Sequence, residues 1–400
     1  MRRLLAIRDA RIYLAGQSLS LLGDTALWLA LGIWAKDLTG SNSAAGLAIF
    51  CVMAPQLLSP LAGLLVDRVR RRPLLLVVNL VTAGVVLLLL AAGERVWVIY
   101  GVGAVYGASY TLLASGQSAL LATLVPPDLL GDANALLQTV REGLRLVAPV
   151  AGAGLYAAAG GAAVAVLDAV TFAVAAAALA ALHVREARPE PHGEPWRRAV
   201  TAGARHIRRT PPLKHVVTAG ALVLLALGFS ETLLFAIADE GLHRPVSFVG
   251  VLMAVQGVGA VAGAALATRV MRRAGEERLA AAGMAVLAAG MLLMASGALG
   301  IVLAGKALFG FGIPWIVVGA MTLLQRLTPG PLQGRTYSAA ELLLGVPQTF
   351  SVALGAALIT VVDYRAMLLA MAVVTTAAAV YLQHRGEKRP RARFETAPAR

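Results

Sequence analysis

Long uninterrupted runs of apolar residues fill almost all of the 400-residue sequence. Each run has about 20 residues, the length that a helix needs to cross a hydrocarbon core of about 30 Å. The runs are continuously apolar and rich in Ala, Leu and Gly, which favours helices over the alternating pattern of barrel strands. We predict twelve membrane spans: residues 12–34, 44–66, 73–93, 96–118, 135–160, 162–183, 215–238, 246–270, 279–297, 301–324, 337–360 and 364–383.

The amount of apolar sequence excludes a water-soluble fold. Hydrophobic residues make up 58% of the chain and charged residues only 14%. Lipid must therefore be the solvent for most of this surface. We predict an all-α integral membrane protein.

The distribution of basic residues predicts the orientation. Only four of the 35 Lys and Arg residues lie in the predicted outer segments: Lys36, Arg95, Arg244 and Arg365. Because cytoplasmic loops carry the excess of Lys and Arg, we expect both termini in the cytoplasm and the protein in a bacterial plasma (inner) membrane. The net charge of +14 follows from this asymmetry, so no nucleic-acid partner is needed to explain it.

The two halves of the sequence resemble each other at an offset of about 200 residues. Asp24-Thr25-Ala26-Leu27 corresponds to Glu231-Thr232-Leu233-Leu234. Such parallel repeats predict two pseudo-symmetric six-helix bundles with a substrate site between them at mid-depth. We predict bundles at residues 1–183 and 215–384, a basic linker at 184–214 along the inner leaflet, and a basic tail at 385–400.

Two motifs resemble a known family. The segment from Gly63 to Arg72 is similar to the signature loop G-x-L-x-D-R-x-G-R-R of the major facilitator superfamily, with Arg70 in place of the second glycine. The resemblance implies the major facilitator fold, and the gating-loop residues would be Gly63, Asp67, Arg68, Arg71 and Arg72. In the fifth span, residues 148–154 resemble the G-P-x-x-G-G stretch of proton-driven exporters, which implies a kink at Pro149 and close packing at Gly152.

Four further segments resemble one branch of that superfamily. They are residues 20–24, 37–41, 132–136 and 167–172. These segments look like the branch that includes the enterobactin exporter and macrolide and multidrug efflux proteins. The resemblance implies export and identifies no cargo.

Ionisable residues inside spans are costly in lipid and indicate functional positions. Asp24 lies near the middle of the first span, so a hypothesis is that it couples protons or contacts a cationic part of the cargo; the alternative is a structural helix contact. In the fifth span, Arg145 can pair with Asp24, with Glu142 beside it, whereas Arg141 is interpreted as lying on a solvated ledge. Glu231 corresponds to Asp24 in the second half, and with Lys306 it predicts an outer gate or a structural tie.

Polar and aromatic side chains within spans are candidates for the wall of a substrate cavity. Rotation of the helices is open at this stage, so we expect only a subset to face it. The candidates are Gln17, Trp28, Tyr110, Gln117, Gln256, Trp315 and Gln348.

These features favour a proton-coupled exporter of amphipathic organic compounds such as antibiotics or siderophores. The alternative within transport is a metabolite uptake symporter or facilitator of the same fold. A polytopic membrane enzyme is disfavoured because no catalytic motif is present, and the single cysteine, Cys51, excludes an internal disulfide and any multi-cysteine metal site. We expect no cofactor and no metal; the partners would be the small substrate, protons and membrane lipids, and the protein a monomer.

Overall fold

The computed structural model describes residues 2–59, 62, 65–66, 69–126, 129–184, 196–329 and 332–387, and this part of the chain is helical without strands. The helices are α1 Arg2–Ala6, α2 Arg8–Thr39, α3 Asn42–Met53, η1 Ala54–Leu58, α5 Arg71–Leu87, η2 Leu88–Ala91, α6 Val96–Leu124, α7 Leu130–Ala180, α8 Trp196–Arg209, α9 Pro211–Ala236, η3 Ile237–Gly241, η4 Val246–Phe248, α10 Val249–Ala274, α11 Glu276–Met294, α12 Leu299–Leu327, α13 Gln333–Leu358 and α14 Tyr364–Glu387.

The predicted membrane fold is confirmed. Among the described residues, ten helices are long and apolar enough to cross a bilayer, and Asn42–Leu58 is a shorter apolar helix. One of the ten, Val147–Ala180, covers parts of two predicted spans, 135–160 and 162–183. Between these parts the backbone of α7 leaves helical geometry at Gly160, with φ 77° and ψ 174°. Glycine adopts this positive φ without a Cβ penalty, so the chain reverses there between spans five and six.

One predicted boundary was wrong in a way that matters for function. The first span was expected to end at residue 34, which placed Lys36 in an outer loop. Helix α2 instead continues to Thr39, and Lys36 is only 4% exposed in its last turn.

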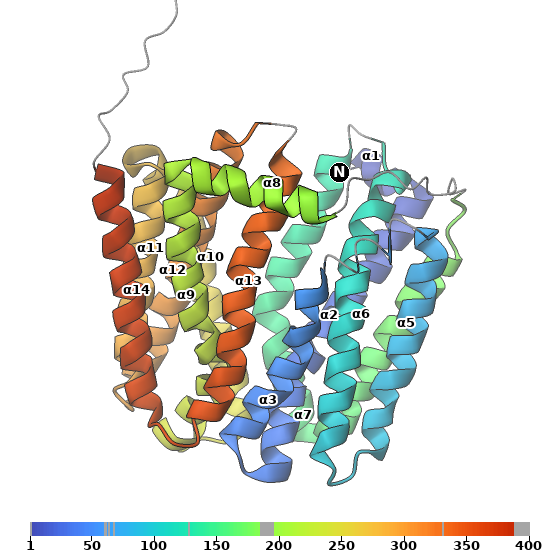
Figure 1. Ribbon diagram of the computed structural model, residues 1–400. Coiled ribbons are helices and arrows are strands. Elements are labelled where there is room, and N and C mark those ends of the chain that lie inside the picture. Colours follow the sequence, from blue (N-terminus) through green and yellow to red (C-terminus); the bar gives the residue numbers. More distant parts are fainter. Residues whose placement is uncertain are drawn as a thin grey trace, which may run out of the picture.

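The helices form two halves that stand side by side (Figure 1). Helices α2 to α7 make one half and α9 to α14 the other, each around its own hydrophobic core. Helix α8 lies across one end of the second half and reaches toward the first, and the start of the chain and the end of α14 lie at that same end. We call this end the α8 face and the other end the opposite face.

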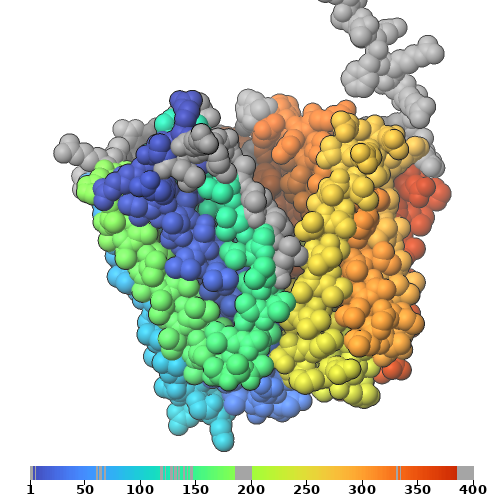
Figure 2. Space-filling model, turned by 180° about the vertical axis from the view of Figure 1, so that it is seen from behind, coloured from blue at the N-terminus to red at the C-terminus, as the bar shows by residue number. Residues whose placement is uncertain are grey.

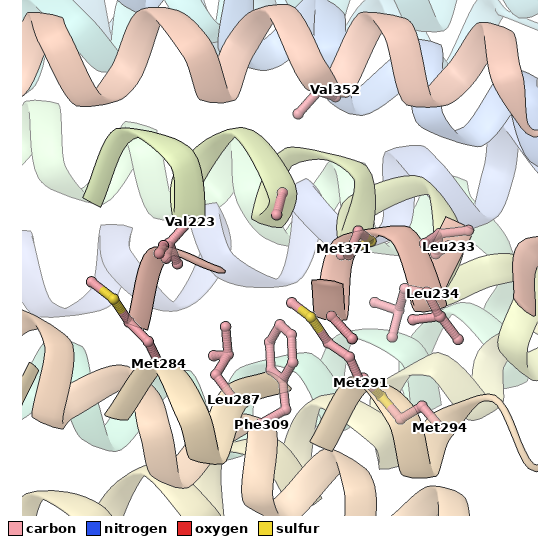
Figure 3. Close-up of a cluster of buried hydrophobic side chains, with 14 of the residues drawn as sticks. Val223, Leu233, Leu234, Met284, Leu287, Met291, Met294, Phe309, Val352 and Met371 are labelled. Carbon is pink, nitrogen blue, oxygen red and sulfur yellow. The ribbon is translucent and has the colours of Figure 1, made fainter. Parts of the chain in front are cut away.

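The core of the second half is rich in methionine. Figure 3 shows Met284, Leu287 and Met291 projecting from α11 beside Phe309 of α12. These side chains are at most 3% exposed. Unbranched Met side chains fill irregular gaps, which suits a junction of several helices.

Helix α8 is docked on the second half. Gly203 lies against the backbone of Arg335, Ile207 is 4% exposed, and the His206 ring is 3.2 Å from the carbonyl oxygen of Leu327. Arg205, Arg208 and Arg209 are exposed on its other side. Helix α8 lies within the predicted linker, residues 184–214. Residues 185–195 of that linker lie outside the described chain.

Glycines let helices touch backbone to backbone at equivalent places in the two halves. Gly107 of α6 packs on the backbone of Val52 in α3, and Gly259 of α10 packs on that of Ala307 in α12. Close approach through small residues is the usual means of helix association in membranes.

This packing predicts opposite effects for two glycines of the same helix. In Gly107→Ala the new Cβ would overlap Val52, so α3 and α6 must separate, at a cost of about 1–3 kcal/mol. In the control Gly101→Ala the Cβ meets open space, and the higher helix propensity of Ala leaves stability unchanged or slightly raised. We expect a lower Tm in detergent for Gly107→Ala only; equal Tm values would contradict the packing described.

Candidate functional site

Asp24 lies at the middle of α2, the longest uninterrupted helix of the first half. It is 16 residues after Arg8, about 24 Å along α2 at 1.5 Å per residue. The Tyr106 hydroxyl of α6 donates a hydrogen bond to Asp24 Oδ1 at 2.9 Å. Tyr106 is 3% exposed and its ring packs edge-on against Phe172 of α7, with centroids 6.1 Å apart. Asp24 is therefore held by side chains from two other helices.

The charges around Asp24 come from α7. Arg141, which is exposed, attracts the Asp24 carboxylate electrostatically, and an Asp24 carboxylate in turn disfavours a negative charge on the buried Asp168. The side chains of the predicted partner Arg145 and of Glu142 lie outside the described set. Arg141, interpreted from the sequence as a ledge residue, is thus the cation that the described structure places in range of Asp24.

The Asp24 region borders the contact between the halves. Ala26 packs on Gly152 of α7, where a Cβ would lie 2.9 Å from the Ala26 Cα atom. Trp28, one turn from Asp24, packs against the cores of both halves. Pro149 lies buried within α7, one turn before Gly152.

Two predicted cavity residues meet inside the first half. Gln17 and Gln117 line a small space of about 10 Å³ together with Tyr13 and Asn79. That volume accommodates about one water molecule, so it is too small for an organic cargo. Tyr110, on α6, is 39% exposed.

The second half has a related arrangement. Lys306 of α12 is 4% exposed, interacts electrostatically with Glu231 of α9, and lies 4.8 Å from the centre of the Phe309 ring. Glu231 and Lys306 occupy the first and fourth spans of their half, as Asp24 and Tyr106 do in theirs. The described structure therefore places a polar pair at corresponding positions in each half.

The remaining predicted cavity residues of the second half are partly buried. Trp315 donates from Nε1 to the carbonyl oxygen of Gly263 at 2.9 Å, which ties α12 to α10. Gln256 of α10 and Gln348 of α13 are half-buried.

A polar cluster joins the halves near the opposite face. Lys36 Nζ lies 2.7 Å from Asp239 Oδ2 of the second half and 2.5 Å from Asn42 Oδ1. The Asn42 amide also donates to Glu240 Oε1 at 2.5 Å. We call Lys36, Asn42, Asp239 and Glu240 the latch. The sequence analysis missed the latch because it assigned Lys36 to a loop. The opposite charges near the outer ends of spans one and seven could have indicated an ion pair between the halves.

Close backbone contacts between the halves lie on the same side as the latch. Gly32 of α2 faces the Phe235 ring, where a Cβ would lie 2.5 Å from it. Gly250 of α10 faces Ala153 of α7, with a corresponding distance of 2.7 Å. Figure 2 shows the halves in contact at its lower end and a recess between them toward the upper end. The halves are thus closed at the opposite face.

The predicted gating loop is only partly described. Gly63, Asp67 and Arg68 lie outside the described residues. Arg72, in the first turn of α5, donates to the carbonyl oxygens of Leu179 and Ala180 at 2.8 and 2.6 Å. Arg71 precedes it in the same turn. Arg72 therefore fastens the start of α5 to the end of α7 at the α8 face.

An apolar cavity of about 130 Å³ lies among α9, α12 and α13. Its lining consists of aliphatic side chains, a methionine and one glycine, on the half of these helices nearer the α8 face. They are Leu213, Val216, Val217, Gly220, Val223, Leu224, Leu227, Ile313, Ile316, Val317, Ala320, Met321, Leu324, Ala340 and Leu344. Such a surface binds hydrocarbon rather than charged groups.

The sequence model of the Major Facilitator Superfamily matches residues 13–242 and 221–399. The chain belongs to the Major Facilitator Superfamily. A curated relative from Sinorhizobium fredii (strain NBRC 101917 / NGR234), the uncharacterized MFS-type transporter y4rN, is 28% identical over 338 residues, which cover 81% of this chain and 82% of that protein. This membership and the membrane-spanning fold make the chain a membrane transport protein.

Solved structures share the fold of this MFS protein. A bacterial homologue of the iron transporter ferroportin, in an inward-facing state, has a TM-score of 0.72 at 17% identity, with coverage of 94% of this chain and 99% of that one. An outward-facing structure of a bacterial ferroportin homologue has a TM-score of 0.62 at 18% identity, covering 95% and 100%. The POT family transporter PepTSo has a TM-score of 0.77 at 11% identity, covering 95% and 98%.

Proposed function

We propose that this MFS protein is a proton-coupled exporter of amphipathic organic compounds that works by alternating access. The observation that carries the proposal is a carboxyl group, Asp24, held by Tyr106 at mid-membrane beside the contact between the halves. A carboxyl group in such a place can take up a proton when it faces one side and release it at the other.

The arrangement of the two halves supports alternating access. The latch and the glycine contacts close the opposite face, while a recess lies toward the α8 face. The larger TM-score to the inward-facing ferroportin homologue agrees with this arrangement. We infer that the α8 face is cytoplasmic, because the exposed arginines of α8 fit an anionic inner leaflet and the basic loops predict the same orientation.

The apolar cavity supports the proposed cargo class. It offers a hydrocarbon surface in the second half, while Asp24 offers a charge in the first. A compound with an apolar body and a cationic group would use both surfaces. Antibiotics of this type are our first candidates, in keeping with the sequence resemblance to efflux proteins.

The experiment is transport by purified protein in liposomes with an imposed pH gradient. The panel contains lipophilic cations, neutral compounds and organic anions of similar size. We expect lipophilic cations to move against their gradient as protons move down theirs. Movement of the compound in the same direction as the protons would indicate symport and contradict export. Transport that does not depend on the pH gradient for any compound would contradict proton coupling.

A side chain that fills the apolar cavity is expected to reduce transport by an amount that depends on cargo size. Ala320→Phe places a ring in the space of about 130 Å³, so we expect transport of bulky compounds to fall more than that of small ones. Ala285→Phe on α11, where the side chain is exposed, is the control. A uniform loss for every compound in both variants would contradict a role of this cavity in binding.

A further inference from the structure

A second carboxyl group, Asp168, is buried against the helix that carries Asp24. A Cβ on Gly23 would lie 2.5 Å from Asp168 Oδ1 and 3.2 Å from its Cα atom. Near the α8 face, Gly16 lies against Ala178 in the same way. Helix α2 and residues 161–180 of α7 therefore pack closely through glycines, and this contact presses Asp168 against the residue next to Asp24.

The Asp168 side chain is shut off from water. It is 0% exposed, and neither carboxyl oxygen has a hydrogen-bond partner among the described residues. The nearby Thr171 hydroxyl gives its single proton to the backbone carbonyl oxygen of Asp168 at 2.8 Å. An ionised carboxylate without a hydrogen-bond donor is costly in such a buried place, so this position favours a carboxyl group that carries its proton.

The groups that act on Asp168 form one cluster. Asp24 from α2 repels an Asp168 carboxylate, and Tyr106 from α6 is affected by both carboxyl groups. Tyr110 acts on Tyr106, and Arg141 from α7 acts on Asp24. Helix α5 also packs on α7, but its charged residues lie in its first turn, at the α8 face.

We propose that Asp168 is a second proton-binding residue of this transporter and that Asp24 and Asp168 load and release protons as one coupled pair. Two neighbouring carboxylates in a low dielectric repel each other, so the state of one sets the affinity of the other for a proton. A proton from water on one side binds a carboxylate oxygen of the pair and later leaves to water on the other side; no other bond forms or breaks. The use of these protons for transport rests on the proposed function.

The test is infrared difference spectroscopy of the full-length protein in lipid nanodiscs, titrated over pH. The readout is the C=O stretching band of protonated carboxyl groups, compared among wild type, Asp24→Asn and Asp168→Asn. We expect the wild-type band to vanish in two steps, and each variant to lose one step. Glu94→Gln, which removes an exposed carboxyl in a turn, should retain both steps.

Two results would contradict the proposal that Asp24 and Asp168 form a coupled pair. One is a protonated carboxyl band in Asp168→Asn that titrates as in the wild type. The other is the absence of any protonated carboxyl band in Asp24→Asn, which would show that Asp168 binds no proton. This measurement tests Asp168 even if Asp168→Asn does not fold. A failure of the proposed function gives a different result. If the band shows two titration steps but the protein has no gradient-driven transport, the carboxyl pair exists and export does not use it.

Discussion

Asp24→Asn is expected to abolish proton-driven export, reducing it to the level of liposomes without protein. A carboxamide has nearly the same shape as the carboxyl group but cannot release a proton. The amide oxygen of Asn can still accept the Tyr106 hydrogen bond, so we expect the variant to fold and to keep the part of cargo binding that the apolar cavity supplies. The measurement is uptake and release of a radiolabelled cargo with and without a pH gradient.

The matched control is Glu94→Gln, which makes the same chemical change at an exposed turn. It should transport like the wild type. Exchange of cargo across the membrane without a gradient should survive in Asp24→Asn, because exchange needs no net proton movement. Full gradient-driven export by Asp24→Asn would exclude this carboxyl from coupling.

Lys36→Met is expected to shift the protein toward the state that is open at the opposite face. Lys36 is buried, whereas the Asp239 side chain is 50% exposed, so the ion pair is worth more than a surface pair and less than a fully buried one, about 1.4 kcal/mol. Its loss would change the ratio of the two states roughly tenfold. Asp239→Asn should act in the same direction.

Distances between spin labels at the opposite face measure this shift. Cysteines at Glu94 in the first half and Val361 in the second, on a Cys51→Ala background, report their separation, since both sites are exposed. Arg326→Met is the control, because its partner Glu276 belongs to the same half. Equal distance distributions for Lys36→Met and the wild type would remove the latch from gating.

The helices were predictable from the sequence because lipid requires about 20 apolar residues per span, and this requirement leaves a clear pattern. The reversal at Gly160 and the central position of Asp24 follow from the same reasoning. The pattern cannot show how a helix is rotated about its axis. Gln17 and Gln117 were accordingly grouped with cavity residues, although they meet around a space the size of one water molecule.

The latch and the packing of Asp168 on Gly23 were missed for a different reason. Both join residues more than 140 positions apart, and no local sequence pattern records such a contact. Asp168 lies near the start of the predicted sixth span, and its neighbour across the helix contact, Gly23, carries no chemical signal. Lys36 was overlooked because the apolar run used to place the first span ends before the charged last turn of α2, so this turn was assigned to a loop.

The proposed proton coupling requires that the Asp24 carboxyl carries a proton that cargo displaces. The most direct test adds cargo to purified protein in weakly buffered detergent solution and measures proton release with a pH-sensitive dye. We expect the wild type to release protons in an amount that saturates with cargo, and Asp24→Asn to lose most of this release. Equal release by the two proteins, at equal cargo binding, would contradict proton coupling through Asp24.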